Sequence, residues 1–272
     1  MAIKLGVITN LTENPSEKLA KVAEMGLPTC QLNAWQPELW TDSIAKLIVE
    51  AQKKHNVEVS SLWAGYPGPA VWNFIDGPST LGFVPAEYRQ MRIESMMRAI
   101  RFAKNIGTPS VTTHAGFIPE SPKDPLYEGT INALRQIANA CKKEGLNFCF
   151  ETGQETPVTL LRAIKDIGTD NLGVNLDPAN LLLYGKGNPV DALDILGPYV
   201  KGVHAKDGDY PTDPNKLGRE YPLGEGKVNF PVFIPKLKSF GFDGPITIER
   251  EISGPQQIED IKRAIALLSA LI

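Results

Sequence analysis

Short apolar runs alternate along the chain with longer segments in which apolar residues recur every three or four positions. The first run covers residues 3–8, and after a polar turn a helical pattern leads through Leu19 and Val22 to Gly26. An apolar run, an amphipathic segment and a closing glycine predict a strand, a helix and the end of that helix. Repeats of this unit predict strands at residues 3–8, 29–32, 57–63, 110–113, 147–150, 172–176, 200–203 and 245–248, with helices at 19–26, 43–54, 85–106, 126–144, 157–167, 189–196, 230–240 and from 256 onward.

The expected strands are continuous apolar runs, which indicates a parallel sheet buried on both faces. Eight strand–helix units are the number that closes into a single (β/α)8 TIM barrel, and we expect residues 1–272 to form one such domain. An open doubly wound sheet is the alternative. It would carry a glycine-rich phosphate loop after the first strand, where this chain has Ile8-Thr9-Asn10-Leu11-Thr12.

The helix expected from residue 256 has the clearest pattern of all. Its apolar residues are spaced along one helical face, which predicts an amphipathic helix. The stripe consists of Ile258, Ile261, Ile265, Leu268 and Ile272.

Composition narrows the choice of partners. The 28 Lys and Arg residues against 31 Asp and Glu give a net charge of −3, which favours neither nucleic acid nor an anionic membrane, so we expect a small polar ligand. Cys30, Cys141 and Cys149 are odd in number and lack metal-ligand spacing, which predicts reduced core thiols. Together with the absence of a signal-peptide pattern and of any apolar run of membrane length, this predicts a cytoplasmic protein.

Two connections are longer than a usual βα loop, and long loops on compact domains often carry function. Residues 64–84 hold Tyr66, Trp72, Phe74 and Phe83 among prolines and glycines, which suits either an aromatic wall for a ligand or a subunit contact. Residues 206–229 are charged and rich in glycine and proline, a composition that a solvated loop would share. The aromatic loop and the apolar last helix would suit a homo-oligomer.

Four of the apolar runs end in a side chain that can bind a metal. Glu151, Asp177 and Glu249 follow three expected strands, and His204 ends the run that begins at Val200. A lone histidine or carboxylate in such a place is more often a structural hydrogen-bonding residue or a helix cap. In a parallel barrel, however, the carboxyl ends of the strands converge, so the four together predict a site for one divalent cation. Three carboxylates and one imidazole suit Mn²⁺, Mg²⁺ or Co²⁺, with Mn²⁺ our first expectation and Zn²⁺ an alternative.

The sequence resembles the xylose isomerase-like TIM barrels known as sugar phosphate isomerases and epimerases, which include ketose 3-epimerases, hydroxypyruvate isomerases and inosose dehydratases. The resemblance covers nearly the whole chain. Its specific points are Thr113-His114-Ala115-Gly116, Glu151-Thr152-Gly153-Gln154-Glu155, Asp177-Pro178-Ala179-Asn180-Leu181, His204-Ala205-Lys206-Asp207, Arg219 with Pro222-Leu223-Gly224-Glu225-Gly226, and Ile248-Glu249-Arg250-Glu251.

The resemblance implies roles for these residues. It gives the metal to Glu151, Asp177, His204 and Glu249, and makes Glu151 and Glu249 the acid-base pair on opposite faces of the sugar. It further implies that His114 and Arg219 contact substrate oxygens. The remaining residues expected at the substrate site are Asn180, Lys206 and Trp63.

One position departs from the family pattern. The family's epimerases, and the related endonuclease IV enzymes, carry a histidine three residues after the aspartate, where this chain has Asn180. An amide hydrogen-bonds a hydroxyl but is a poor metal ligand, so the substrate contact is altered. Endonuclease IV needs a histidine cluster for several zinc ions, whereas this chain has three histidines in all.

The sequence therefore predicts an enzyme, a divalent-metal-dependent sugar isomerase or epimerase that acts through a metal-bound enediolate. Two alternatives stay open. One is a lyase or hydrolase acting on a keto-sugar or 3-keto-glycoside, because the same proton abstraction can expel a leaving group. The other is a sugar-binding barrel without turnover.

Overall fold

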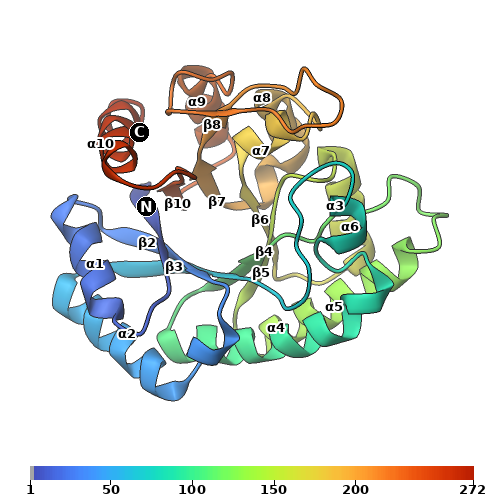
Figure 1. Cartoon of the computed structure of the whole chain (residues 1–272), viewed down its shortest axis with the longest axis horizontal. Coiled ribbons are helices and arrows are strands. Elements are labelled where there is room, and N and C mark those ends of the chain that lie inside the picture. The colour runs from blue at the N-terminus through green and yellow to red at the C-terminus, as the bar shows by residue number, and fades with distance from the viewer. Residues whose placement is uncertain (1–2) are drawn as a thin grey trace.

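The computed structural model describes residues 3–272, so the first two residues of the expected 1–272 domain lie outside the described residues. Eight parallel strands form a closed barrel in the order β1-β10-β7-β6-β5-β4-β3-β2, and helices surround it (Figure 1). The predicted (β/α)8 barrel is confirmed. Its strands are β1 (Lys4–Asn10), β2 (Thr29–Ala34), β3 (Glu58–Ala64), β4 (Ser110–Thr113), β5 (Asn147–Glu151), β6 (Leu172–Leu176), β7 (Val200–Ala205) and β10 (Pro245–Ile248).

The larger helices follow the strands as the sequence predicts. They are α1 (Pro15–Glu24), α2 (Asp42–His55), α4 (Ala86–Ile106), α5 (Tyr127–Lys143), α6 (Pro157–Ile167), α8 (Pro189–Leu196), α9 (Phe230–Ser239) and α10 (Pro255–Ser269). Local capping sets their ends. The Thr156 hydroxyl accepts a 3.3 Å hydrogen bond from the Thr159 N–H at the start of α6, and Gly168 ends this helix with φ +73°.

Short elements in the connections were not predicted. They are α3 (Gly77–Thr80), α7 (Pro178–Leu183), the 3₁₀ turns η1 (Pro37–Leu39) and η2 (Gly197–Tyr199), and an antiparallel ribbon of β8 (Asp207–Gly208) with β9 (Glu220–Tyr221). Elements of two to six residues are too short to show a hydrophobic period, and their neighbours in the fold stabilise them.

Strand register brings the predicted site residues to one end of the barrel. Glu151 at the end of β5 pairs with Asn175 in β6, and His204 in β7 pairs with Thr247 in β10. The pairing of β1 with β10 closes the circle, with Val7 opposite Ile248. The carboxyl ends of β5, β6, β7 and β10 therefore surround one point.

The stripe predicted on the last helix is only partly buried. Ile261 and Leu268 are buried, but Ile258 is 52% exposed and Ile272 lies beyond the helix end. The predicted helix is present, and its apolar stripe is buried in the middle and exposed at both ends. Near its start, α10 instead buries Asp260, whose carboxylate accepts a 2.8 Å hydrogen bond from Arg250.

Two composition-based expectations can be compared with the structure. Cys30, Cys141 and Cys149 are buried free thiols, and burial raises the pKa of Cys30 to about 12. Within residues 3–272, no helix combines the length and the apolar character that crossing a bilayer requires.

Candidate metal centre and substrate cavity

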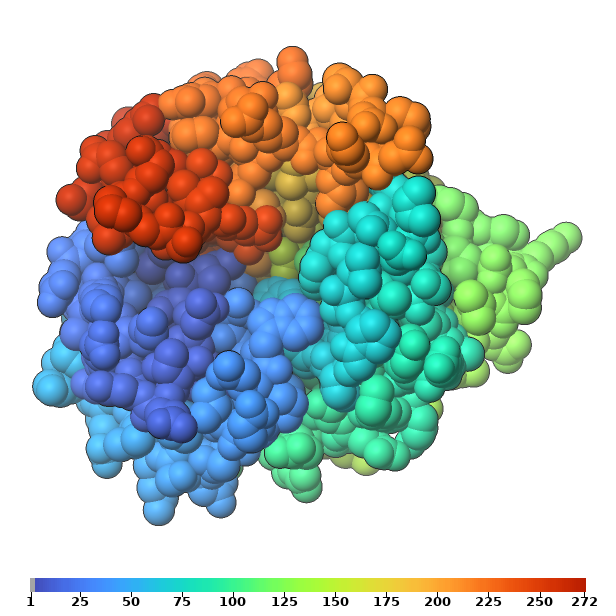
Figure 2. Space-filling model, viewed as in Figure 1, coloured from blue at the N-terminus to red at the C-terminus, as the bar shows by residue number. Residues whose placement is uncertain are grey.

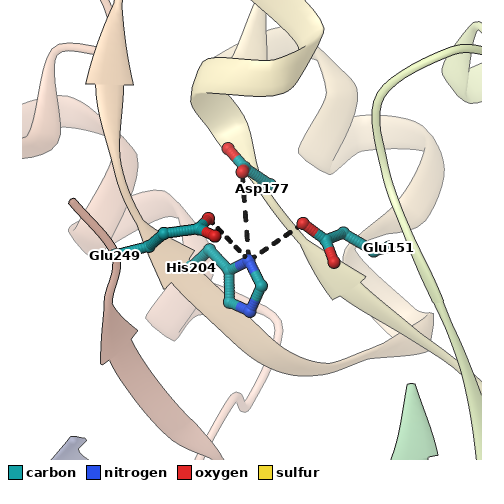
Figure 3. Close-up of side chains that lie close together, drawn as sticks. All are labelled: Glu151, Asp177, His204 and Glu249. Atoms are coloured by element: carbon teal, nitrogen blue, oxygen red, sulfur yellow. Dashed lines mark hydrogen bonds and ion pairs between the residues drawn. The ribbon is translucent and has the colours of Figure 1, made fainter. Parts of the chain in front are cut away.

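The four predicted metal ligands converge on one point at the carboxyl end of the barrel. One ligand atom from each of Glu151, Asp177, His204 and Glu249 lies within 4.8 Å of the other three. His204 Nδ1 is 3.1 Å from Glu151 Oε1, 3.1 Å from Glu249 Oε2 and 3.9 Å from Asp177 Oδ2. Figure 3 shows the three carboxylates directed at this nitrogen from three sides. The predicted cluster is therefore present in the structure.

Asp177 illustrates how the chain forms this cluster locally. It follows β6 and caps α7, because its Oδ1 accepts a 2.9 Å hydrogen bond from the Asn180 N–H. The backbone N–H of Asp177 is itself held by the Thr152 hydroxyl at 2.8 Å. One carboxylate oxygen thus fixes the side chain, and Oδ2 is left for the cluster.

Gln31 holds the His204 ring from the opposite side and was not identified from the sequence. Its Oε1 lies 2.6 Å from His204 Nε2, and its Nε2 donates a 3.3 Å hydrogen bond to Asn175 Oδ1. The acceptor oxygen holds a ring proton on Nε2, so that when a cation displaces the proton from Nδ1, the Nδ1 lone pair can bind it. Gly202 makes room for this chain of contacts, because a Cβ there would lie 2.8 Å from Asn175 Oδ1.

The cluster fits a divalent cation. Asp177 Oδ2 and Glu249 Oε2 are buried and accept no hydrogen bond from any residue that the structure describes. Buried carboxylate oxygens without a donor are costly, and a cation would satisfy them. Three oxygen donors and one imidazole suit Mn²⁺, Mg²⁺, Co²⁺ and Zn²⁺, so this donor set leaves the metal undetermined.

A cavity of about 420 Å³ opens above the cluster. Figure 2 shows a hollow at the centre of this face, between the blue N-terminal segments, the cyan segment around α3 and the red C-terminal segments. Its lining includes five of the predicted site residues: Trp63, His114, Glu151, Asn180 and Glu249. Trp72, which the sequence offered as part of an aromatic wall, also lines it. The lining is completed by residues to which the sequence gave no role in the site: Ile8, Asn33, Trp35, Gln154, Leu183, Tyr184, Leu217 and Glu251.

Glu151 has three side-chain partners outside the cluster. The Trp63 indole N–H donates a hydrogen bond to its Oε2, and His114 Nε2 lies 3.4 Å from its Oε1. Asn180 Nδ2 donates to the same Oε1 at 3.4 Å. These contacts place three of the predicted substrate-binding residues around one carboxylate at the floor of the cavity.

Comparison with known proteins identifies the family to which this chain belongs. The model of the family described as xylose isomerase-like TIM barrel matches residues 19–271. The chain belongs to this family.

The chain is similar to two solved structures and to one protein compared by sequence. The crystal structure of a xylose isomerase domain protein from Planctomyces limnophilus is similar over 100% of this chain and 98% of that one, with a TM-score of 0.94 and 32% identity. L-ribulose 3-epimerase has a TM-score of 0.76 at 16% identity, over 99% of this chain and 94% of that one. An uncharacterized protein of Methanocaldococcus jannaschii is 25% identical over 92% of this chain and 84% of its own.

Electrostatics in this xylose isomerase-like site favour the charged forms of Glu151, His204 and Glu249, whereas burial raises the pKa of Asp177. Burial alone lowers the pKa of His204, but the carboxylates of Glu151 and Glu249 raise it well above its usual value. Burial raises the pKa of Glu249, whereas the charges of Lys206 and His204 outweigh this and lower it to about 2. A cation would take over the stabilising role of the positive charges in this cluster.

Lys206 lies behind the cluster rather than in the cavity lining. Its Nζ is buried, 2.9 Å from Glu251 Oε1, 3.2 Å from Asn180 Oδ1, and 3.5 Å from both Asp177 Oδ2 and Glu249 Oε2. Because Nζ donates to the amide oxygen, the Asn180 NH₂ group faces Glu151. Lys206 thus neutralises carboxylates and orients Asn180.

Arg219, expected at the substrate, is exposed and does not belong to the cavity lining. Its guanidinium carbon lies 5.3 Å from the centre of the Tyr221 ring. The loop around it is shaped by Asp207, whose Oδ2 accepts hydrogen bonds from the N–H groups of Gly224 at 2.9 Å and Gly226 at 3.1 Å. Contact of Arg219 with substrate stays a prediction and requires this loop to move.

The aromatic loop at residues 64–84 reaches the site through Trp72, which lines the cavity. Tyr66 and Phe83, near the two ends of this loop, are buried. Arg92 of α4, fully buried, fixes the loop by donating to the carbonyls of Pro67 at 3.1 Å, Pro69 at 2.7 Å and Gly82 at 2.5 Å. Of the two interpretations of this loop, its position favours the wall for a ligand.

Proposed function

We propose that this protein is a divalent-metal-dependent sugar isomerase or epimerase. The observation that carries the proposal is the placement of Glu151 and Glu249 on different sides of His204 Nδ1, each at 3.1 Å, at the floor of a cavity. Two carboxylates around one reaction centre suit a reaction in which one group removes a proton and another returns it. The fold is shared with L-ribulose 3-epimerase, which supports this reaction class.

Glu151, Asp177, His204 and Glu249 would hold the cation, with Mn²⁺ our first choice. When bound, such a cation polarises a carbonyl and so acidifies the neighbouring C–H group. Glu151 and Glu249 then move the proton at the carbon next to the carbonyl. Trp63 and His114 hold Glu151 in place for this step.

The substrate hydroxyls have donors and acceptors in the same cavity. His114 and Asn180 present ring and amide groups to it, and Trp63 covers its inner wall. Lys206 acts on the substrate indirectly, by orienting Asn180. We further propose that Arg219 reaches the substrate when its loop closes, and that the protein acts in the cytoplasm without a nucleic-acid or membrane partner. A homo-oligomer remains part of the proposal.

The same proton abstraction serves a lyase or hydrolase when a leaving group stands beside the carbon that loses the proton. A keto-sugar or 3-keto-glycoside meets that condition, and product analysis separates elimination from epimerisation. A sugar-binding barrel without turnover is less well supported, because none of the four ligands is replaced.

Solvent exchange tests the proposal directly. The manganese-loaded protein is incubated in D₂O with a panel of ketoses and 3-keto-glycosides, and NMR follows the carbon next to the carbonyl. We expect deuterium to enter at that carbon for at least one sugar. If every sugar keeps its proton while the protein holds its metal, the proposal fails.

A further inference from the structure

Aromatic rings form a continuous strip from the metal cluster to the mouth of the cavity. Trp63, bonded to Glu151, is 7% exposed, and its ring lies 5.1 Å from that of Trp35. Trp35 in turn lies 6.3 Å from Trp72, at an interplanar angle of 90°. Trp35 and Trp72 are 37% and 38% exposed, so the strip leads from a buried ring at the floor to solvent-exposed rings at the mouth.

Apolar side chains also line another part of the cavity. Leu183, Tyr184 and Leu217 all contribute to the lining. Tyr184 is fixed by ring contacts with Phe74 at 6.1 Å and Phe117 at 5.9 Å. The cavity therefore combines a polar, acidic floor with apolar walls.

Charge in the cavity is negative. Among the described residues that line it, Glu151, Glu249 and Glu251 are acidic, and there is no Lys or Arg. The nearby Lys206 ammonium is already engaged, at 2.9 Å from Glu251 Oε1 and 3.5 Å from Glu249 Oε2. Away from the bound cation, and while Arg219 stays outside the cavity, an anionic substrate group would meet carboxylates without a guanidinium or ammonium donor in the lining.

The loops where such barrels usually bind phosphate also contribute no Lys or Arg to the cavity lining. Phosphate groups frequently bind at the loops that follow the seventh and eighth barrel strands. Here the loop after β7 contributes Leu217 to the cavity, and the segment after β10 contributes Glu249 and Glu251. Neither places a Lys or Arg in the cavity lining, and Arg219, on the loop after β7, is exposed outside it, so neither forms a phosphate site in this structure.

Neutral amides supply the polar contacts instead. Asn33, Gln154 and Asn180 line the cavity, and Lys206 turns the NH₂ group of Asn180 toward Glu151. Uncharged donors and acceptors match hydroxyl and keto groups. A sugar ring placed at the floor, however, would leave Trp35 and Trp72 at the mouth exposed to water.

We propose, as a refinement that rests on the proposed function, that the substrate is an uncharged glycoside. Its sugar ring occupies the acidic floor, and its aglycone is a second ring that fits into the corner between the perpendicular rings of Trp35 and Trp72, with its apolar face on one of them and its edge against the other. Sugar phosphates and small keto acids are poor substrates. Aromatic side chains bury a large apolar area and orient ring partners, so the strip discriminates by the aglycone.

A matched set of ligands tests this inference. It consists of methyl 3-keto-β-D-glucoside, its 6-phosphate, the phenyl 3-keto-β-D-glucoside and the 3-keto derivative of cellobiose. Calorimetry with the manganese-loaded protein gives the dissociation constant of each, and deuterium exchange gives the rate. We expect the phenyl compound, the cellobiose compound or both to bind at least 10-fold more tightly than the methyl glycoside, and the 6-phosphate at least 10-fold more weakly.

Two variants locate the effect. Trp72→Ala should remove most of the preference for a second ring, measured as the ratio of the dissociation constants of the methyl and ring glycosides within the same variant. Ile75→Ala is the matched control, because Ile75 belongs to the same loop, is 66% exposed and does not line the cavity. It should keep the full preference.

The outcomes separate this inference from the proposed function. Preferential binding of ring aglycones without any proton exchange would support the ligand class and contradict the isomerase. Fastest exchange with the 6-phosphate would support the isomerase and overturn the uncharged glycoside. Equal binding of methyl and ring glycosides would also overturn it. If Trp72→Ala in addition loses oligomers, the strip is a contact between copies of the chain.

Discussion

Gln31 in β2 and His204 in β7 are joined across the interior of the barrel, with 2.6 Å between Gln31 Oε1 and His204 Nε2. Both side chains are fully buried. Because the glutamine oxygen only accepts, it fixes the ring tautomer in which Nδ1 is free to bind a metal. The metal site thus depends on a residue from the far side of the barrel.

Replacing Gln31 by leucine should therefore weaken metal binding. Gln31→Leu removes the acceptor for His204 Nε2, and loss of such an outer partner typically lowers metal affinity 10- to 100-fold. Competition between the protein and a fluorescent chelator for Mn²⁺ measures the change.

Gln31→Glu is the matched variant for this measurement. It keeps an acceptor oxygen and should bind Mn²⁺ at least as tightly as the parent protein, since a carboxylate makes the imidazole a stronger ligand. Circular dichroism establishes that both variants fold. Equal affinities of the parent and a folded Gln31→Leu would show that His204 needs no partner.

Removal of the metal should abolish proton exchange but leave the barrel folded. The core is large and is made of apolar side chains that do not touch the cluster, such as Leu62, Val111 and Phe233. Treatment with EDTA, dialysis and circular dichroism test the fold, and re-addition of Mn²⁺ tests recovery. Full exchange activity in protein shown by elemental analysis to be metal-free would contradict the account.

Glu155 gives the protein a stability that depends on pH. Burial raises the pKa of its carboxyl to about 7, and neither oxygen has a hydrogen-bond partner within residues 3–272. The folded protein therefore holds a proton that the unfolded chain releases near its ordinary value of 4.5. The stabilisation is complete below about pH 4.5 and is lost as the pH rises through about 7, up to roughly 3 kcal/mol.

Glu155→Gln should lack this loss between pH 5 and pH 8. Urea denaturation at the two pH values gives the free energies of unfolding. The control is Glu50→Gln on the exposed face of α2, which should follow the parent at both values. A parent protein whose stability is the same at pH 5 and pH 8 would show that Glu155 is not a buried acid.

The regular part of the fold could be predicted because it depends on local pattern. Continuous apolar runs such as Leu172–Leu176 can only be buried strands, and the polar residue that follows each run then lies at the carboxyl end. Glu151, Asp177 and Glu249 could therefore be predicted at the carboxyl end of the barrel, where the structure has them. The spacing of apolar residues identified the stripe of α10 but did not give the exposure of its two ends, because exposure depends on what the helix packs against.

The partners of the site could not be predicted, because they depend on contacts between distant strands. Gln31 stands 173 positions before His204, and a polar residue inside the run Thr29–Ala34 is its only signal in the sequence. Trp35 stands just beyond the same strand, with nothing nearby to indicate a cavity. Lys206 was expected to face the substrate, yet four polar partners hold it behind the cluster.

In the proposed reaction, Glu151 and Glu249 move protons at one carbon from different sides. Glu249→Gln and Glu151→Gln keep the side-chain shape and one ligating oxygen while removing the basic carboxylate, which should cost on the order of 10² to 10⁴ in rate. The deciding measurement is deuterium exchange of each of two separated epimers by each metal-loaded variant. We predict that each variant still exchanges the proton of one epimer, a different one in each case, and interconverts neither. Interconversion by a metal-loaded Glu249→Gln at the parent rate would contradict the account and leave Glu249 as a ligand only.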